Sequence, residues 1–243
     1  MRLQTPAWLV CGFAMLLSAG GAFGQGSFQN LGFETASLVP IPGDPYGRVQ
    51  FAPAFPGWTG LIGVVQSTDA LYNNSFLDTS GITILDHGWP VGSLGAGGLI
   101  SGNFTALLQA GFAGASGTPA DTTLSQTGLV PAGAKSLQFK AYDPYDLSPY
   151  VPMAVTLGGQ RLSLTPLASG ANFTLYGADL QAWAGQTAEL DFIVFAERPH
   201  VNNNYVFLDS IQFSDQPVPE PGVLSLSTLG ALLLGWRALR RRR

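Results

Sequence analysis

The sequence predicts that the Asp209 carboxylate lies among apolar side chains and therefore needs a partner for its charge. If residues 205–213 form a strand, alternate side chains share one face: Tyr205, Phe207, Asp209, Ile211 and Phe213. A carboxylate in such an apolar stripe is costly to bury alone. One candidate partner is local, either Arg198 in a salt bridge or the N–H groups of a turn. The other is a hard cation that Asp209 shares with Glu34 and backbone carbonyls.

Aromatic side chains in loop-like segments give a second chemistry, stacking on the apolar faces of sugar rings. The candidate ligand-binding residues are Trp58, Trp89, Tyr142 and Tyr145. Aromatic rings beside polar neighbours suit amphipathic ligands. The alternative for each tryptophan is a place in the core, because tryptophan is buried on average.

Catalytic motifs are absent from the sequence. The chain has two histidines, His87 and His200, and no Gly-x-Ser-x-Gly, His-Glu-x-x-His or phosphate-binding glycine loop. Asp143 and Asp146 form an acidic pair, but they lie three residues apart around a proline, whereas the two acids of a glycosidase flank the scissile bond. We therefore expect no enzymatic activity, with a glycan hydrolase as the third-ranked alternative.

The N-terminal 24 residues have the pattern of a secretory signal peptide. Arg2 precedes a short apolar segment, and Ala22-Phe23-Gly24 is a small-x-small cleavage site. The single cysteine, Cys11, lies inside this leader, so the mature chain has no thiol for disulfides or for metal binding.

Processing at both ends changes the charge. Arg2 leaves with the leader, and five arginines and Glu220 leave with the tail, so 11 basic and 15 acidic residues become 5 and 14. A domain with a net charge near −9 lacks the basic face that nucleic acid requires. Neutral glycans, or anionic glycans bridged by cations, are better candidates than nucleic acid as binding partners.

The remaining residues, 25–217, predict one all-β domain. Period-two segments are typical of half-buried strands, and turn residues separate them. Gly158-Gly159 predicts a two-residue hairpin turn, and Asp179 caps a helical turn that Gly185 ends. Ten to twelve such strands suit two packed antiparallel sheets. The strand segments that we expect are 28–34, 61–67, 81–85, 103–109, 122–128, 136–141, 151–157, 160–165, 172–176, 187–195 and 205–213.

The segment 218–243 consists of a proline-flanked glutamate, a short apolar run and an arginine-rich end. Pro219, Glu220 and Pro221 favour an extended, accessible stretch. A charge-free apolar run follows over 222–236, and five arginines end the chain, as on the cytoplasmic side of a membrane. The run is shorter than the roughly 20 residues of a stable spanning helix, which weighs against the alternative, a permanent single-pass anchor.

These features resemble the PEP-CTERM sorting signal of exported bacterial proteins. The resemblance implies an exosortase-type processing enzyme as partner. It also implies attachment to the membrane through the C-terminal segment before processing, and the cell surface or extracellular space afterwards.

A second resemblance concerns the two ends of the mature domain. Asn30-Leu31-Gly32-Phe33-Glu34 and Phe207-Leu208-Asp209-Ser210-Ile211 are similar to the first and last strands of jelly-roll galactose-binding and carbohydrate-binding modules. The resemblance implies a jelly-roll sandwich in which Glu34 and Asp209 share a structural calcium ion.

The function expected from the sequence is that of an exported, non-catalytic β-sandwich with extracellular polysaccharide as its candidate ligand. The alternative is a structural surface or biofilm-matrix protein that has no defined ligand.

Overall fold

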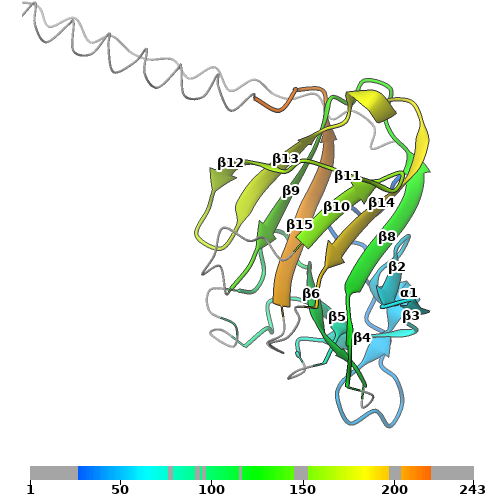
Figure 1. Ribbon diagram of the computed structural model, residues 1–243. Helices are drawn as coiled ribbons and strands as arrows, with labels where there is room; N and C mark the ends of the chain where they lie inside the picture. Colours follow the sequence, from blue (N-terminus) through cyan, green and yellow to red (C-terminus); the bar gives the residue numbers. More distant parts are fainter. Residues whose placement is uncertain are drawn as a thin grey trace, which may run out of the picture.

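The computed structural model describes residues 27–75, 79–90, 94, 97–114, 117–144, 153–196 and 204–219. Within these ranges strands dominate and pack as two sheets (Figure 1). The predicted all-β, two-sheet sandwich is therefore confirmed. Strand pairing is antiparallel except between β4 and β5, which run parallel. In the part of the chain that the structure describes, no helix has the length and apolar character needed to cross a membrane.

The larger sheet has nine strands. Its order is β1-β4-β5-β6-β15-β9-β13-β12, and β7 pairs with β6. Their bounds are β1 Val49–Gln50, β4 Asp69–Tyr72, β5 Gly81–Leu85, β6 Thr105–Ala113, β7 Thr118–Ala120, β9 Ser136–Tyr142, β12 Thr165–Ser169, β13 Thr174–Asp179 and β15 Asn204–Ser214.

The smaller sheet has six strands in the order β11-β10-β14-β8-β2-β3. Their bounds are β2 Thr59–Ile62, β3 Val65–Gln66, β8 Thr122–Leu129, β10 Met153–Leu157, β11 Gln160–Arg161 and β14 Thr187–Val194. The described ranges also contain a short helix, α1 (Phe51–Ala54), and a 3-10 turn, η2 (Gln181–Trp183).

Local turn chemistry explains several connections. Gly158 and Gly159 have φ of 57° and 75° and join β10 to β11, as a two-residue turn with positive φ requires. Asp179 accepts a hydrogen bond from the Gln181 N–H at 2.9 Å, and Gly185 ends the turn with φ 76°. The hairpin and the helical turn are thus where the sequence predicts them, although Leu180 rather than Asp179 is the N-cap residue of η2.

The main core lies between the sheets. Phe139, Leu108 and Val206 of the larger sheet and Leu124 and Phe192 of the smaller one belong to this cluster and are almost fully buried. A second cluster lies on the opposite face of the larger sheet. It consists of Leu85, Trp89, Leu94, Leu107, Tyr205 and Phe207.

Strand β15 changes faces part-way along, which corrects the predicted single stripe. Tyr205 and Phe207 belong to the second cluster, whereas Ile211 and Phe213 belong to the main core. The register against β9 shifts between Asp209 and Gln212, and Ser210 has φ 51°. One extra residue in a bulge reverses the alternation.

The predicted first strand, 28–34, is irregular. Asn30 and Phe33 have positive φ, 51° and 61°, which a strand does not contain. The segment nevertheless meets the last strand, because the Ile211 N–H donates to the Leu31 carbonyl at 2.9 Å. The expected neighbourhood of the two ends is present without the expected strand.

Candidate functional site

Asp209 lies at the bulge of β15 with 1% of its surface exposed. Its Oδ2 accepts hydrogen bonds from the Ser101 N–H at 3.0 Å and the Thr105 Oγ1 at 2.7 Å, while Oδ1 accepts from the Ser210 N–H. Burial raises the pKa of Asp209 to about 6, although these hydrogen bonds lower it and the charge of Glu34 raises it. This carboxylate is hydrogen-bonded but has no cationic partner among the described contacts.

Glu34 reaches the same loop from the N-terminal segment. Its carboxylate accepts from the Asn103 N–H at 2.9 and 3.0 Å, from Asn103 Nδ2 at 3.0 Å and from the Phe104 N–H at 3.3 Å. Gly102, with φ 61°, leaves the space for it, since an added Cβ would overlap the Glu34 carboxylate. We call Glu34, Asp209 and the loop 101–105 the carboxylate clasp.

The clasp brings together the two residues predicted to share calcium. A Cβ added to Gly32 would lie 3.9 Å from both Asp209 Oδ1 and Glu34 Cγ. The hydrogen-bond partners of the two carboxylates are N–H and O–H donors. Across the described ranges, no three His, Cys, Asp or Glu side chains gather as metal ligands. The contacts show the local alternative, with turn amides as partners; Arg198 lies outside the described residues. Calcium stays a prediction.

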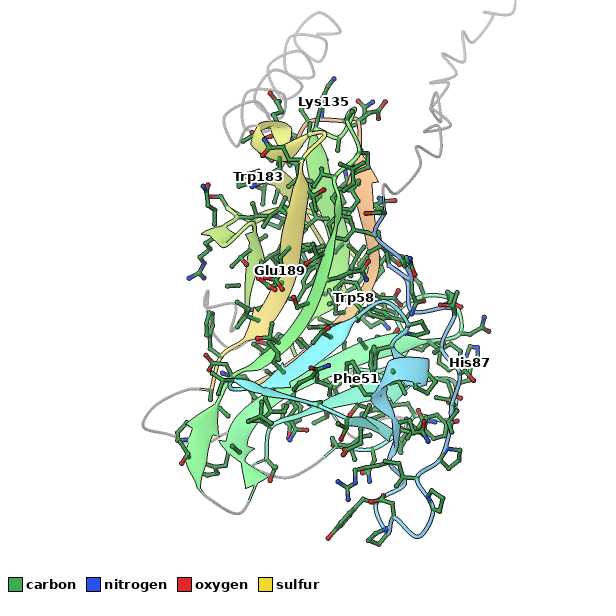
Figure 2. The ribbon with its side chains drawn as sticks, turned by 90° about the vertical axis from the view of Figure 1, so that its right-hand side faces the viewer. Phe51, Trp58, His87, Lys135, Trp183 and Glu189 are labelled. Carbon is green, nitrogen blue, oxygen red and sulfur yellow. The ribbon has the colours of Figure 1, made fainter. Side chains whose placement is uncertain are left out.

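The two candidate tryptophans are buried and do not form a common platform. Trp58 is 5% exposed, packs between Phe33 and Phe192, and donates from Nε1 to the Asn30 carbonyl at 3.2 Å. Trp89 is 6% exposed and meets Phe207 edge to face in the second cluster. Figure 2 shows Trp58 inside the sandwich. Because large rings stabilise more when buried, the ligand-stacking interpretation of both tryptophans is corrected to core packing.

Tyr142 does line a hollow, at the end of the sandwich between the sheets. This inter-sheet hollow has a volume of about 250 Å³. Its lining includes the aromatic residues Tyr142, Phe173 and Tyr176, together with buried Met153 and Val206. Tyr176 packs against the main core, whereas Tyr142 packs against the second cluster on the opposite face of the larger sheet. Tyr145, the fourth predicted ligand residue, lies outside the described residues.

The rings of the hollow are held by their neighbours. Tyr176 stacks on Phe139 with centroids 5.6 Å apart. Phe173 packs on Gly170, where an added Cβ would overlap the ring, and Lys140 Nζ lies 4.9 Å from its centroid. Lys140 also donates to Ser101 Oγ at 2.6 Å, so the hollow and the carboxylate clasp share a neighbour.

Phe173 and Tyr176 are site residues that the sequence analysis missed. Phe173 follows a turn and Tyr176 lies in a period-two segment, and both patterns are equally typical of ordinary sheet residues. The signal that separates them from core residues is their position at the open end of the sandwich, which depends on strand order.

The Asp86–His87 pair is held in a turn. Asp86 accepts from Tyr72 OH at 2.7 Å, from Asn73 Nδ2 at 2.6 Å and from the Gly88 N–H at 2.7 Å. Burial pushes the pKa of Asp86 up, but these hydrogen bonds outweigh it and keep the pKa below its ordinary value. His87 is exposed at the surface (Figure 2). Asp143 lines the hollow and Asp146 lies outside the described residues, so the expected absence of catalysis stays a prediction.

Comparisons with known proteins include a distant structural similarity to a phage protein. No family model and no curated protein matches the sequence. The fold is similar to the crystal structure of the bacteriophage CBA120 tailspike protein 4 enzymatically active domain, with a TM-score of 0.39 and 12% sequence identity. The similarity covers 78% of this chain and 21% of that one, so the chain spans about a fifth of the tailspike protein's length.

Proposed function

We propose that this chain is an exported, non-catalytic β-sandwich protein that binds extracellular polysaccharide in the inter-sheet hollow. The observation that carries the proposal is that three aromatic residues, Tyr142, Phe173 and Tyr176, line one cavity that also contains polar groups. Aromatic residues of the lining would contact the C–H face of a sugar, and Asp143 and Thr174 of the same lining would offer polar groups to its hydroxyls.

The size of the hollow limits what enters it. Its volume of about 250 Å³ is below the roughly 300–1,000 Å³ of sites for drug-sized ligands. It therefore suits one sugar unit, for example a chain end or a side branch, rather than a long stretch of polymer.

Export and sorting complete the proposal. The leader over 1–24 and the tail over 218–243 lie outside the described residues except for Val218 and Pro219. Pro219 is exposed where the described chain ends, and Val218 lies beside Gly177 of β13. An exposed exit at this point supports access for an exosortase-type enzyme to the Pro219-Glu220-Pro221 motif. In the proposal, the membrane holds the tail until processing releases the domain to the surface.

A blocking substitution tests the hollow without removing packing. Ser169 is exposed and lines the hollow, whereas its neighbour Ala168 is exposed and does not. We expect Ser169→Trp to abolish the part of polysaccharide binding that the hollow supplies, and Ala168→Trp to leave it unchanged. The measurement is isothermal titration of the full chain with neutral hexasaccharides, namely β-1,3- and β-1,4-glucans and a β-1,4-mannan.

Equal binding by the two tryptophan variants and the wild type would reject the hollow as the site. No binding of any neutral hexasaccharide by the wild type would reject the polysaccharide function, and the structural surface protein without a ligand would replace it.

A further inference from the structure

A second candidate binding site surrounds Tyr46, toward the β1 edge of the larger sheet. This groove of about 560 Å³ is lined by residues of the loop before β1, of β4 and of β5. Tyr46 is 53% exposed, and the described ranges contain no other aromatic side chain among the exposed large apolar residues. We call this feature the Tyr46 groove.

Arg48 is fixed beside the tyrosine by two carboxylates. Its Nε donates to Asp44 Oδ1 at 2.7 Å, its Nη2 lies 2.6 Å from the same oxygen, and its Nη1 lies 3.5 Å from Asp69 Oδ1. The Arg48 guanidinium lies 5.7 Å from the centroid of the Tyr46 ring. Asp69 is 36% exposed and Arg48 is 34% exposed, so both remain within reach of a ligand.

The loop that carries these residues is also fixed. Asp44 Oδ2 accepts from the N–H groups of Tyr46 at 2.9 Å and of Arg48 at 2.8 Å. The backbone hydrogen bond from Arg48 is the largest of the effects that lower the pKa of Asp44. Gly43 and Gly47 turn the chain with φ of 75° and 71°. A ring and an ion pair that are ordered before binding lose little conformational freedom on binding.

The charge of the groove favours a neutral ligand. Arg48 is matched by two carboxylates, so the groove carries a slight negative charge and repels an anionic polymer. Adjacent donors on Arg48 and acceptors on Asp69 suit neighbouring hydroxyls of a sugar, and the exposed Tyr46 ring suits its C–H face. The volume is enough for a short stretch of chain rather than for one unit.

The Tyr46 groove and the inter-sheet hollow are separate places. They share no lining residue. The groove lies at β4 and β5 and the hollow at β15, β9 and β13, with β6 between them in the sheet. The outermost strands of the two sites, β4 and β13, are five strand spacings apart, or about 24 Å at 4.8 Å each, and the nearest, β5 and β15, are two spacings apart, or about 10 Å. In Figure 1 the blue loop before β1 lies at the bottom, away from β12 and β13.

We propose that the Tyr46 groove is a second binding site for neutral polysaccharide, so that one molecule bridges two sugar chains. The groove stands on its own geometry, whereas the bridging rests on the proposed function of the hollow. Two sites on one rigid sheet, too far apart to be filled by one sugar unit, connect chains or distant parts of one chain and raise avidity without a new contact.

Titration of the full-length protein with the same neutral hexasaccharides tests the groove. We expect two sites in the wild type, one in Tyr46→Ala and one in Ser169→Trp, with binding at the altered site weakened by about tenfold or more. Tyr46→Phe keeps the ring and should keep binding within about threefold. Leu129→Ala, which removes a 44% exposed apolar side chain outside the groove, is the matched surface control. A polygalacturonate hexamer should not bind the groove.

The outcomes separate the two proposals. If Tyr46→Ala binds the hexasaccharides as the wild type does, the proposed site in the groove is rejected. If Ser169→Trp alone loses binding, the proposed site in the hollow is still upheld. If Tyr46→Ala alone loses hexasaccharide binding, the proposed site in the groove is upheld, and the proposed site in the hollow and the bridging are rejected. Light scattering of long neutral glucan should show protein-dependent cross-linking that either single variant removes, and cross-linking that survives in Tyr46→Ala would contradict the bridging.

Discussion

Asp209 is a buried carboxylate whose ionisation works against the fold. Its pKa rises from 3.8 to about 6 on folding because burial disfavours the charged form. The folded chain therefore holds this proton more tightly than the unfolded chain. The resulting stabilisation is complete below pH 3.8 and is lost as pH rises to about 6.

The pH dependence of stability measures this effect. At 1.36 kcal/mol per pKa unit, the contribution of Asp209 should fall by about 3 kcal/mol between pH 3.5 and 7. Asp209→Asn removes the titration, so the difference in unfolding free energy between wild type and variant should change by that amount across the window. Urea unfolding at several pH values checks it. A difference that stays constant with pH would show that Asp209 does not titrate there.

Gly102 allows a comparison of two glycines with similar backbone conformations. Gly102 and Gly43 have φ of 61° and 75°, but only Gly102 has a neighbour, the Glu34 carboxylate, in the place of an added Cβ. We expect Gly43→Ala to cost about 1 kcal/mol for its backbone alone. Gly102→Ala should cost at least about 1 kcal/mol more, because Glu34 must leave the amides of Asn103 and Phe104. Equal losses in urea unfolding would mean that the clasp contributes nothing.

At the scale of elements, the carboxylate clasp joins the N-terminal segment, the 101–105 loop and β15. Calcium between Glu34 and Asp209 would neutralise two like charges and strengthen that junction. If the ion binds, the unfolding free energy should rise by about 2.7 kcal/mol at a hundredfold excess over the dissociation constant. Excess chelator should lower the melting temperature of the wild type, and Asp209→Asn should lose this response. Identical melting curves with and without chelator, and no metal by elemental analysis, would reject the ion.

The sequence predicts where strands lie better than it predicts how their faces are oriented and how the strands are arranged. Period-two patterns place β5, β8 and β14 nearly to the residue, because each strand has one face in the core. The same rule fails for β15, since a single extra residue at Ser210 reverses the faces and leaves no mark in the pattern. It fails again for 28–34, where Asn30 and Phe33 turn the chain.

Candidate sites depend on strand order and loop packing, so the sequence predicts some site residues correctly and others not. Glu34 and Asp209 do come together, and Tyr142 does line a hollow. Trp58 and Trp89 look like Tyr142 in sequence but lie in two separate clusters. Tyr46, in a loop between two glycines, carries no periodic signal at all. Which aromatic ring faces solvent is decided by strand order and loop packing, which residue type does not encode.

At the scale of the whole molecule, the expected sorting can be tested on protein from its native host. The described chain ends exposed at Pro219, directly before Glu220 and Pro221, which lie outside the described residues. We expect the mature surface protein to lack the residues after about Pro219, by analogy with other short removable tails. Intact-mass spectrometry of that protein checks the cleavage. A mature form that ends at Arg243 would contradict it and support the permanent anchor.

The central place of β15 has a consequence for the order of events during the proposed export. This last strand lies between β6 and β9 (Figure 1), so the nine-stranded sheet stays in two parts until residues 204–214 arrive. Pairings this distant in sequence make folding slow, on the order of milliseconds to seconds. If the chain is exported as proposed, a sheet that cannot close early keeps the chain unfolded while it passes through a translocation channel. Completion of the fold would then coincide with the arrival of the tail at the membrane, so the domain would mature just before the proposed sorting motif is presented.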